Sequence, residues 1–281
     1  VMLHVPYQGE GRIAPNMREY VVKQLKETVI PTLERISGVK FDIDRLRQYM
    51  RESAKAEDDL VAVLQSAKNR PSPIDGYFGA VYYIGPIFTA FRGTPEASQF
   101  YSLLRQEIDE RVRLGKGPIT PDGEMGEEKY RLVTEGPPNW TSFRDFWKMF
   151  YDEGAVVVAS TYSKVGGLYD FGFRHDADNP LESLADYCLG CYTNLNLPSR
   201  IDMICKYIDE YQADGLLINS IKSCNSFSAG QLLILREVEK RTGKPAAFIE
   251  TDLVDPRYFS AANVKNRLES YFQMVKAKRG A

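Results

Sequence analysis

The chain has little of several features that mark common classes of protein. Its 281 residues include four cysteines and two histidines, and its net charge is only −2. Four cysteines are too few for a disulfide scaffold in a chain of this length. The slightly negative net charge lacks the excess of basic residues that nucleic-acid binding requires. No apolar run approaches the roughly 20 residues that span a bilayer, and the first residues lack the pattern of a signal peptide. The sequence therefore predicts a soluble, cytoplasmic protein with no nucleic-acid or membrane partner.

The two common phosphate-binding motifs are also missing. There is no G-x-x-x-x-G-K-[ST] loop, and no G-x-G-x-x-G follows an expected strand, so we do not expect this chain itself to bind ATP or a dinucleotide. His4 and His175 are too few, and too far apart in sequence, to indicate a histidine-based metal site. The chain is nevertheless long enough to fill the core of one large domain or of two ordinary ones.

Residues 1–129 are predicted to be mostly helical. Apolar residues recur at helical spacing over 17–36, and Gly38 follows as a C-terminal stop. Asp42 or Asp44 can cap a second helix that continues to about Leu64. Further along come an apolar, aromatic segment at 77–91 that is expected to be buried, a third helix at 95–114, and a polar loop at 115–128.

The first five residues have the pattern of a short β-strand, and a turn follows at Pro6–Gly9. A mature protein rarely opens abruptly within a buried strand. We therefore expect residues 1–129 to comprise the end of an N-terminal α/β domain, most of which would precede Val1, and the helical region.

Residues 130–281 have a different pattern from the first half, because short apolar runs typical of strands alternate with expected helices. The expected strands are 130–134, 155–159, 216–218 and 246–249, and the expected helices are 142–152, 199–211, 228–241 and 261–278. Four strand–helix units imply a parallel sheet covered on both faces. The predicted fold class is therefore α/β, with a helical first half followed by a flavodoxin- or Rossmann-like C-terminal domain at 130–281.

Polar residues follow each predicted strand. Right-handed crossovers place all four strand C-termini at one edge of the sheet, where open α/β sheets bind ligands. The loops at this edge are Gly136–Trp140, Ser160–Tyr162, Asn219–Asn225 and Glu250–Arg257. We expect a site built from these loops, with Cys224 near its centre and with Asn139, Trp140 and Asn225 as candidate substrate-binding residues.

Cys224 lies in a polar loop just before a predicted helix. Free amides and the positive end of a helix dipole favour the thiolate, which is the form that binds iron or zinc. An average cysteine instead packs as a small apolar residue. The residue pattern alone leaves both interpretations of Cys224 open.

The other cysteines differ in context. Cys188 and Cys191 form a C-x-x-C pair, which suits metal or redox chemistry but equally fits two unligated thiols in a tyrosine-rich loop. Cys205 shares the apolar face of a predicted helix with Ile201, Ile204 and Ile208, and we expect it in the core.

Two groups of ionisable residues also have alternative interpretations. His175 can donate a proton, although a solvated loop histidine is the more common state. Asp252 and Asp255 can form an acid/base pair. We favour instead a turn at Asp255-Pro256-Arg257 that is closed by an internal ion pair.

Two long segments near the C-terminus carry a resemblance to a known family. The segments 214–245, which includes Ser223-Cys224, and 250–260 resemble the C-terminal domain of the benzoyl-CoA reductase and 2-hydroxyacyl-CoA dehydratase superfamily. Within it, the whole chain is similar to the B-type core subunits of class I, ATP-dependent benzoyl-CoA reductases. The segments that carry this closer resemblance are Val5–Gly9, Ser37–Asp42, Ser72–Asp75, Glu135–Trp140 and Ala185–Tyr192.

The resemblance implies a 4Fe–4S cluster held by about three cysteines, with one iron open to a thioester substrate. Cys224 matches the C-terminal ligand of that pattern, and the other ligands would lie in the domain expected upstream of Val1. Cys188 and Cys191 are further candidate ligands, although they are not general among the dehydratases.

The implied reaction is the reduction of the ring of benzoyl-CoA to a cyclic diene-carbonyl-CoA, with electrons from reduced ferredoxin. The implied partners are a homologous second core subunit and two activase-like subunits that hydrolyse ATP. Ring protonation needs an acid, for which Tyr162, Ser160 and His175 are candidates. Two alternatives remain: a 2-hydroxyacyl-CoA dehydratase subunit, which is a lyase with the same fold and cluster, and a non-catalytic subunit that only completes an interface.

Overall fold

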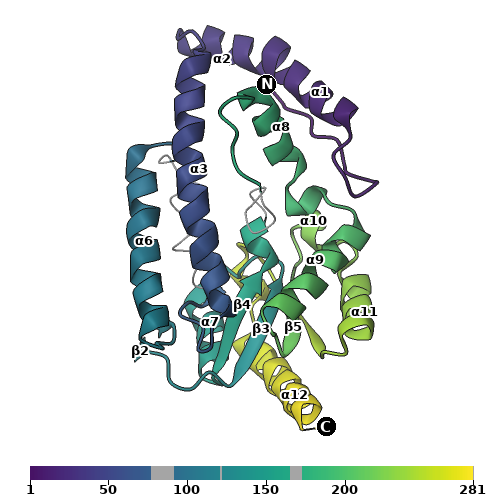
Figure 1. Cartoon of the computed structure of the whole chain (residues 1–281). Helices are drawn as coiled ribbons and strands as arrows, with labels where there is room; N and C mark the ends of the chain where they lie inside the picture. The colour runs from purple at the N-terminus through teal and green to yellow at the C-terminus, as the bar shows by residue number, and fades with distance from the viewer. Residues whose placement is uncertain (77–91, 121, 165–172, 281) are drawn as a thin grey trace. The chain divides into compact units, whose positions relative to one another are not determined.

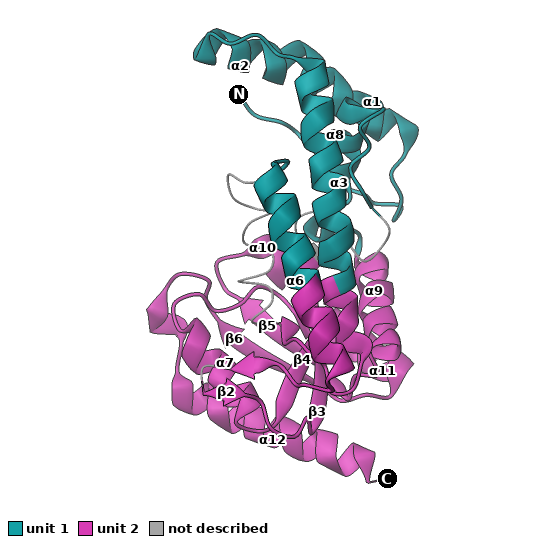
Figure 2. Ribbon diagram, turned by 60° about the vertical axis from the view of Figure 1, so that its left-hand side comes forward, with its two compact units in different colours: residues 1–62, 84–105, 164–196 teal, residues 63–83, 106–163, 197–281 magenta. Residues whose placement is uncertain are grey.

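The computed structural model describes residues 1–76, 92–120, 122–164 and 173–280, so the predicted buried segment at 77–91 lies outside the described residues. The chain divides into two compact units (Figure 2). Unit 1 comprises residues 1–62, 84–105 and 164–196, and unit 2 comprises residues 63–83, 106–163 and 197–281. Among the helices that the structure describes, none is long and apolar enough to cross a membrane.

Unit 2 is built on a four-stranded parallel sheet, which confirms the predicted α/β class. Its strands are β3 (Tyr130–Glu135), β4 (Ala155–Ser160), β5 (Gly215–Ile221) and β6 (Ala246–Thr251), in the order β4-β3-β5-β6. Each predicted strand is present and runs further at its carboxyl end than predicted. Strand β5 is buried along its whole length, as expected for a central strand covered on both faces.

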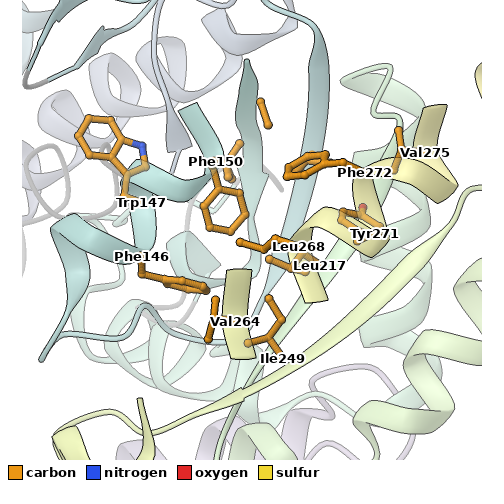
Figure 3. Close-up of a cluster of buried hydrophobic side chains, with 13 residues drawn as sticks. Phe146, Trp147, Phe150, Leu217, Ile249, Val264, Leu268, Tyr271, Phe272 and Val275 are labelled. Atoms are coloured by element: carbon orange, nitrogen blue, oxygen red, sulfur yellow. The ribbon is translucent and has the colours of Figure 1, made fainter. Parts of the chain in front are cut away.

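Helices cover the sheet of unit 2 (Figure 1). Helices α7 (Phe143–Tyr151) and α12 (Ala261–Arg279) pack on one face, and α9 (Leu197–Glu210) and α11 (Gln231–Thr242) pack together on the other. Figure 3 shows the core under α7 and α12, where aromatic side chains of α7 meet aliphatic side chains of β5, β6 and α12. This burial of large apolar side chains supplies the main driving force for the layer.

The helix predicted at 228–241 begins at Gln231, and a separate short helix precedes it. Helix α10 (Asn225–Ser228) is one short turn, and α11 begins after Gly230, whose φ is +83°. A Cβ at this position would lie 2.9 Å from Leu197 Cδ1, so the chain turns there on a glycine. Cys224 therefore precedes a four-residue helix, and the dipole contribution predicted for its thiolate is correspondingly small.

Shorter elements complete the part of unit 2 that the structure describes. They are the 3₁₀ helices η2 (Ser66–Lys68) and η5 (Pro256–Tyr258) and the small antiparallel pair β1 (Ile119–Thr120) and β2 (Gly123–Glu124). The pair lies within the polar loop predicted at 115–128. The 3₁₀ helix η3 (Thr161–Lys164) follows β4.

Unit 1 is helical, as predicted for the first half. The segments α1 (Pro15–Gln24), π-helical η1 (Leu25–Val29) and α2 (Ile30–Ser37) follow one another directly, and Gly38 ends them with φ +70°. Helix α8 (Pro180–Leu189) packs Leu181, Ala185 and Leu189 against α1 and η1. The predicted second and third helices are α3 (Ile43–Gln65) and α6 (Pro95–Arg113).

Two sequence predictions for unit 1 were wrong. Residues 1–5 form no strand, and the backbone pairing nearby is one isolated parallel bridge between Gln8 and Leu195. A strand persists only where a neighbour pairs with its backbone groups. No helix was predicted between 165 and 198, and this stretch contains α8 and the 3₁₀ helix η4 (Tyr192–Asn194).

Candidate functional site

The ends of β3, β4 and β5 are joined by buried contacts at the carboxyl edge of the sheet. Thr134 Oγ1 donates a hydrogen bond to Ser160 Oγ at 2.8 Å, and the amide of Gly136 donates to Thr161 Oγ1 at 3.2 Å. Gly136 has a φ of +97°, and a Cβ there would lie 2.2 Å from the carbonyl oxygen of Asn219. Only glycine fits where the chain leaves β3 this close to β5.

Asn219, near the end of β5, joins the loop after β3 to the last residue of β6. Its Nδ2 donates to the carbonyl oxygen of Pro137 at 2.7 Å, and its Oδ1 accepts from Thr251 Oγ1 at 2.8 Å. Asn219 and Thr251 are both buried, so these hydrogen bonds lie in a low-dielectric environment that strengthens them. The loop after β3 and the ends of β5 and β6 are therefore fixed to one another.

Cys224 lies on this edge, in the loop after β5, and is partly exposed. Its amide donates to the carbonyl oxygen of Ile221 at 3.2 Å, and its own carbonyl oxygen accepts from the amide of Ser228 at 2.9 Å. On the other side, the amide of Ser223 donates to Asp252 Oδ2 at 3.0 Å. The backbone around the thiol is thus held from both directions.

Asp252 holds the loop after β6 as well. Its Oδ1 accepts from the amides of Val254, at 3.1 Å, and Asp255, at 3.0 Å. Burial alone would raise the pKa of Asp252, but the hydrogen bonds from Val254, Asp255 and Ser223 outweigh it and lower the pKa to about 2. The turn favoured at Asp255-Pro256-Arg257 is present, because the guanidinium of Arg257 contacts the Asp255 carboxylate at 2.5 Å.

Aromatic side chains line the same edge. The ring of Trp140 stacks on Phe143 with centroids 5.7 Å apart, and it meets Tyr162 edge-on at 6.0 Å. Burial raises the pKa of Tyr162, so its phenol stays protonated near neutral pH. Ser160, the other predicted proton donor at this edge, already accepts from Thr134 and from the amide of Tyr162.

Asn139 retains unused hydrogen-bonding capacity. It is completely buried, and its Oδ1 accepts from Thr141 Oγ1 and from the amide of Ser142, both at 2.9 Å. Its Nδ2 has no hydrogen-bond partner among the described residues. A buried donor without an acceptor is costly, and a ligand oxygen at this edge would remove that cost.

The described residues provide only part of what an iron–sulfur cluster needs. All four cysteines are free of disulfide bonds. Among the described residues of either unit, no three His, Cys, Asp or Glu side chains are arranged to hold a metal ion. A 4Fe–4S cluster takes several cysteine thiolates, so the edge of unit 2 fits one corner of such a cluster, through Cys224, and not a complete site.

The C-x-x-C pair belongs to unit 1. Cys188 lies in the last turn of α8 rather than in the predicted loop, and Cys191 follows the helix, with its sulfur 3.3 Å from Thr193 Oγ1. Burial raises the pKa of Cys188, and the neighbouring Cys191 adds to the shift, so the free thiol is favoured there when no metal is bound. Cys205 on α9, which was expected in the core, is instead partly exposed, and burial raises its pKa too.

His175 also belongs to unit 1, and the expectation of a solvated histidine was wrong. Its side chain is 4% exposed and is paired with the fully buried carboxylate of Glu57. The two residues are 118 positions apart. The burial of His175 therefore depends on a tertiary contact that neither local pattern indicates.

Sequence reasoning missed a second buried pair, in unit 2. Gln231, the first residue of α11, donates through Nε2 to the carboxylate of Glu135 at the end of β3. Both side chains are buried, and the contact ties α11 to the loop that begins at Gly136. The available signal was an acidic residue directly after the predicted strand at 130–134.

The chain matches the family model of the 2-hydroxyglutaryl-CoA dehydratase D-component over residues 1–275. It therefore belongs to this family, which confirms the resemblance to the superfamily. The α/β fold and the gathered loops at the carboxyl edge of the sheet are thus those of a member of this family.

Among curated proteins, the chain is 78% identical over 279 residues to the B-type subunit of the benzoyl-CoA reductase of Thauera aromatica. It is 26% identical over 281 residues to the (R)-phenyllactyl-CoA dehydratase alpha subunit of Clostridium sporogenes. It is 27% identical over 280 residues to the (R)-2-hydroxyisocaproyl-CoA dehydratase alpha subunit of Clostridioides difficile. In each case 99% or more of this chain is matched, and it spans 65% of the relative's length.

Proposed function

We propose that the chain is part of a benzoyl-CoA reductase core subunit. Its reaction would be the two-electron reduction of the aromatic ring of benzoyl-CoA to cyclohexa-1,5-diene-1-carbonyl-CoA. The observation that carries this proposal is the 78% identity with the B-type subunit of a benzoyl-CoA reductase, which extends over 99% of the chain. The identity with the two dehydratase alpha subunits is only 26% and 27%.

The residues at the sheet edge suit this chemistry. Adding an electron to a benzene ring is very unfavourable, and the thioester carbonyl helps because it delocalises the added charge. The unused Nδ2 of Asn139 can donate to such an oxygen. The ring of Trp140 and the side chain of Asn225 would contact the acyl group. The protonated phenol of Tyr162, with Ser160, would be a local proton source.

A 4Fe–4S cluster would supply low-potential electrons when bound. Cys224 would hold it together with further cysteine ligands. Cys188 and Cys191 remain candidate ligands. Electrons would come from ferredoxin through two activase-like subunits that hydrolyse ATP, and a homologous second core subunit would complete a cytoplasmic complex.

The assignment of Cys224 is tested on the full-length complex with Cys224→Ser. We expect Cys224→Ser to lose the signal of one cluster in electron paramagnetic resonance, with a matching loss of iron and sulfide, because serine lacks the thiolate. Cys205→Ser is the matched control, since Cys205 is also partly exposed in unit 2 but lies on α9. Unchanged iron and spectra in Cys224→Ser would remove the assignment.

A dehydratase subunit is the second candidate, because the family model is that of a 2-hydroxyglutaryl-CoA dehydratase component. Such an enzyme removes water without net consumption of electrons. If Cys224→Ser changes neither iron content nor activity, a non-catalytic subunit that completes an interface becomes the better description.

A further inference from the structure

The end of helix α8, which belongs to unit 1 (Figure 2), carries two cysteines on one turn of the chain. Cys188 lies in the last turn of α8, Leu189 is its last residue, and Gly190 has φ −77° and ψ 0°. A helical residue followed by one with these angles makes a type I turn, whose first and last Cα atoms lie within about 7 Å of each other. Disulfides join Cα atoms that are about 4.4–6.8 Å apart. The backbone therefore holds Cys188 and Cys191 at a separation that a disulfide can bridge.

Hydrogen bonds fix the backbone on both sides of this turn. The amide of Gly190 donates to the carbonyl oxygen of Asp186 at 2.8 Å. The amide of Asn194 donates to the carbonyl oxygen of Cys191 at 2.9 Å, and its Nδ2 donates to that of Leu189 at 3.0 Å. A bond between groups that are already held in place costs little conformational entropy. The turn is therefore preorganised for a bond between the two sulfur atoms.

The two thiols differ in their surroundings, although both are partly exposed. Burial and then the neighbouring Cys191 raise the pKa of Cys188, and the electrostatic contribution of Cys191 is that of a sulfur nearby. The negative end of the α8 dipole also disfavours a charge on Cys188. In contrast, Thr193 Oγ1 lies 3.3 Å from the sulfur of Cys191, and its hydroxyl can donate to a thiolate there. Cys191 is therefore the more suitable attacking thiol of the two.

A metal site and a disulfide are the two uses of such a pair, and they need different numbers of residues. Among the described residues, no third His, Cys, Asp or Glu side chain completes a metal-binding group with Cys188 and Cys191. A disulfide needs no residue beyond these two. Since a disulfide leaves no thiolate to bind iron, the two uses exclude each other and can be told apart by experiment.

We propose that Cys188 and Cys191 form a redox-active dithiol that exchanges with a low-molecular-weight disulfide, R–S–S–R. The thiolate of Cys191 attacks one sulfur of this reactant, which forms a mixed disulfide and releases one R–S⁻. The thiolate of Cys188 then attacks the sulfur of Cys191, which forms the internal disulfide and releases the second R–S⁻. The two cysteines are oxidised by two electrons, the reactant is reduced by two, and the two cysteine protons pass to the released thiolates. An excess of the thiol R–SH reverses both steps.

The test is made on the full-length complex, incubated without oxygen with oxidised glutathione. Remaining thiols are then alkylated with iodoacetamide, and the peptides are mapped by mass spectrometry without reduction. We expect the peptide that carries Cys188 and Cys191 to be alkylated at neither position and to be lighter by two hydrogen atoms. Dithiothreitol should restore both thiols. Alkylation of both cysteines after the glutathione treatment would overturn the proposal.

Two variants separate this chemistry from metal binding and from non-specific oxidation. In Cys188→Ser the mixed disulfide cannot be resolved, so Cys191 should keep one glutathione while the iron content of the complex matches wild type. Loss of iron in this variant would make the pair cluster ligands and overturn the proposal. Cys205→Ser is the matched control, because it removes a partly exposed thiol of unit 2, and it should form the internal disulfide as wild type does. None of these readouts depends on whether the complex reduces benzoyl-CoA, so the proposed function and this inference can fail separately.

Discussion

Asp252 stabilises the Cys224 loop in a way that depends on pH. Its carboxylate accepts from the amides of Ser223, Val254 and Asp255, and its pKa is lowered from 3.8 to about 2. Because the pKa of this carboxyl group is lower in the folded state than in the unfolded state, its contribution to stability is complete at pH values above the unfolded-state pKa. That stabilisation is lost as the carboxylate is protonated, from about pH 4 down to about pH 2.

We therefore expect Asp252→Asn to be less stable than wild type near neutral pH and the difference to shrink between about pH 4 and pH 2. The asparagine keeps an acceptor oxygen but carries no charge at any pH. The measurement is the free energy of unfolding of both proteins in urea at a series of pH values. A difference that stays constant over this range would mean that the charge of Asp252 contributes nothing.

Single residues were predictable where the determining contacts are local. The Asp255–Arg257 ion pair spans two positions, and the sequence indicated it correctly. The state of His175 was not predictable in the same way, because Glu57 and Arg92 are 118 and 83 positions away. Glu135 and Gln231 are likewise 96 positions apart. No local pattern indicates which distant carboxylate a buried side chain will meet.

At the scale of elements, the capping of α3 shows how a local signal becomes structure. The sequence left Asp42 and Asp44 as alternatives. The structure selects Asp42, whose Oδ1 accepts from the amides of Asp44 at 2.9 Å and Arg45 at 3.2 Å. The side chain of Asp44 points to solvent, 82% exposed, and pairs with Arg47.

The two aspartates should therefore differ when each is replaced by alanine. Asp42→Ala removes the acceptor for two amides at the start of α3 and should cost about 1 kcal/mol of stability. Asp44→Ala, the matched control, removes an exposed ion pair and should cost less than about 0.5 kcal/mol. Chemical denaturation of both variants checks this, and equal losses would rule out Asp42 as the cap.

Element boundaries were predictable where periodicity and breaking residues agree. The strands of unit 2 and the stop at Gly38 follow from apolar runs and glycine. Helix α8 was missed, although Pro180 at its start and the apolar spacing of Leu181, Leu184 and Ala185 are helical signals. The separate helix α10 was missed. Gly230, between α10 and α11, has a φ of +83° and leaves no room for a Cβ beside Leu197, which no local pattern indicates.

At the scale of the whole molecule, the sheet topology was the most useful part of the sequence analysis. Four parallel strands require their carboxyl ends to share one edge, and the structure joins the loops there through Asn219, Thr251 and Gly136. The sequence could not establish a complete cluster site, because Cys224 is the only cysteine it places at that edge. If Cys224 binds the cluster proposed above, the remaining ligands would come from outside this edge of the sheet.

Electron stoichiometry distinguishes the two enzymatic candidates for the assembled protein. A ring reductase consumes two electrons for each benzoyl-CoA converted, because two C–H bonds form. A dehydratase removes water from its substrate and needs electrons only to start, since the electron that activates the substrate is returned at the end of each cycle.

We expect the full-length complex, supplied with reduced ferredoxin and ATP, to oxidise ferredoxin in proportion to the benzoyl-CoA consumed and to release a diene product. The same complex supplied with a 2-hydroxyacyl-CoA should form no unsaturated acyl-CoA. If the complex instead removes water rapidly from the hydroxyacyl thioester while ferredoxin stays reduced, the chain belongs to a lyase. The 78% identity with the reductase subunit would then not reflect a shared reaction.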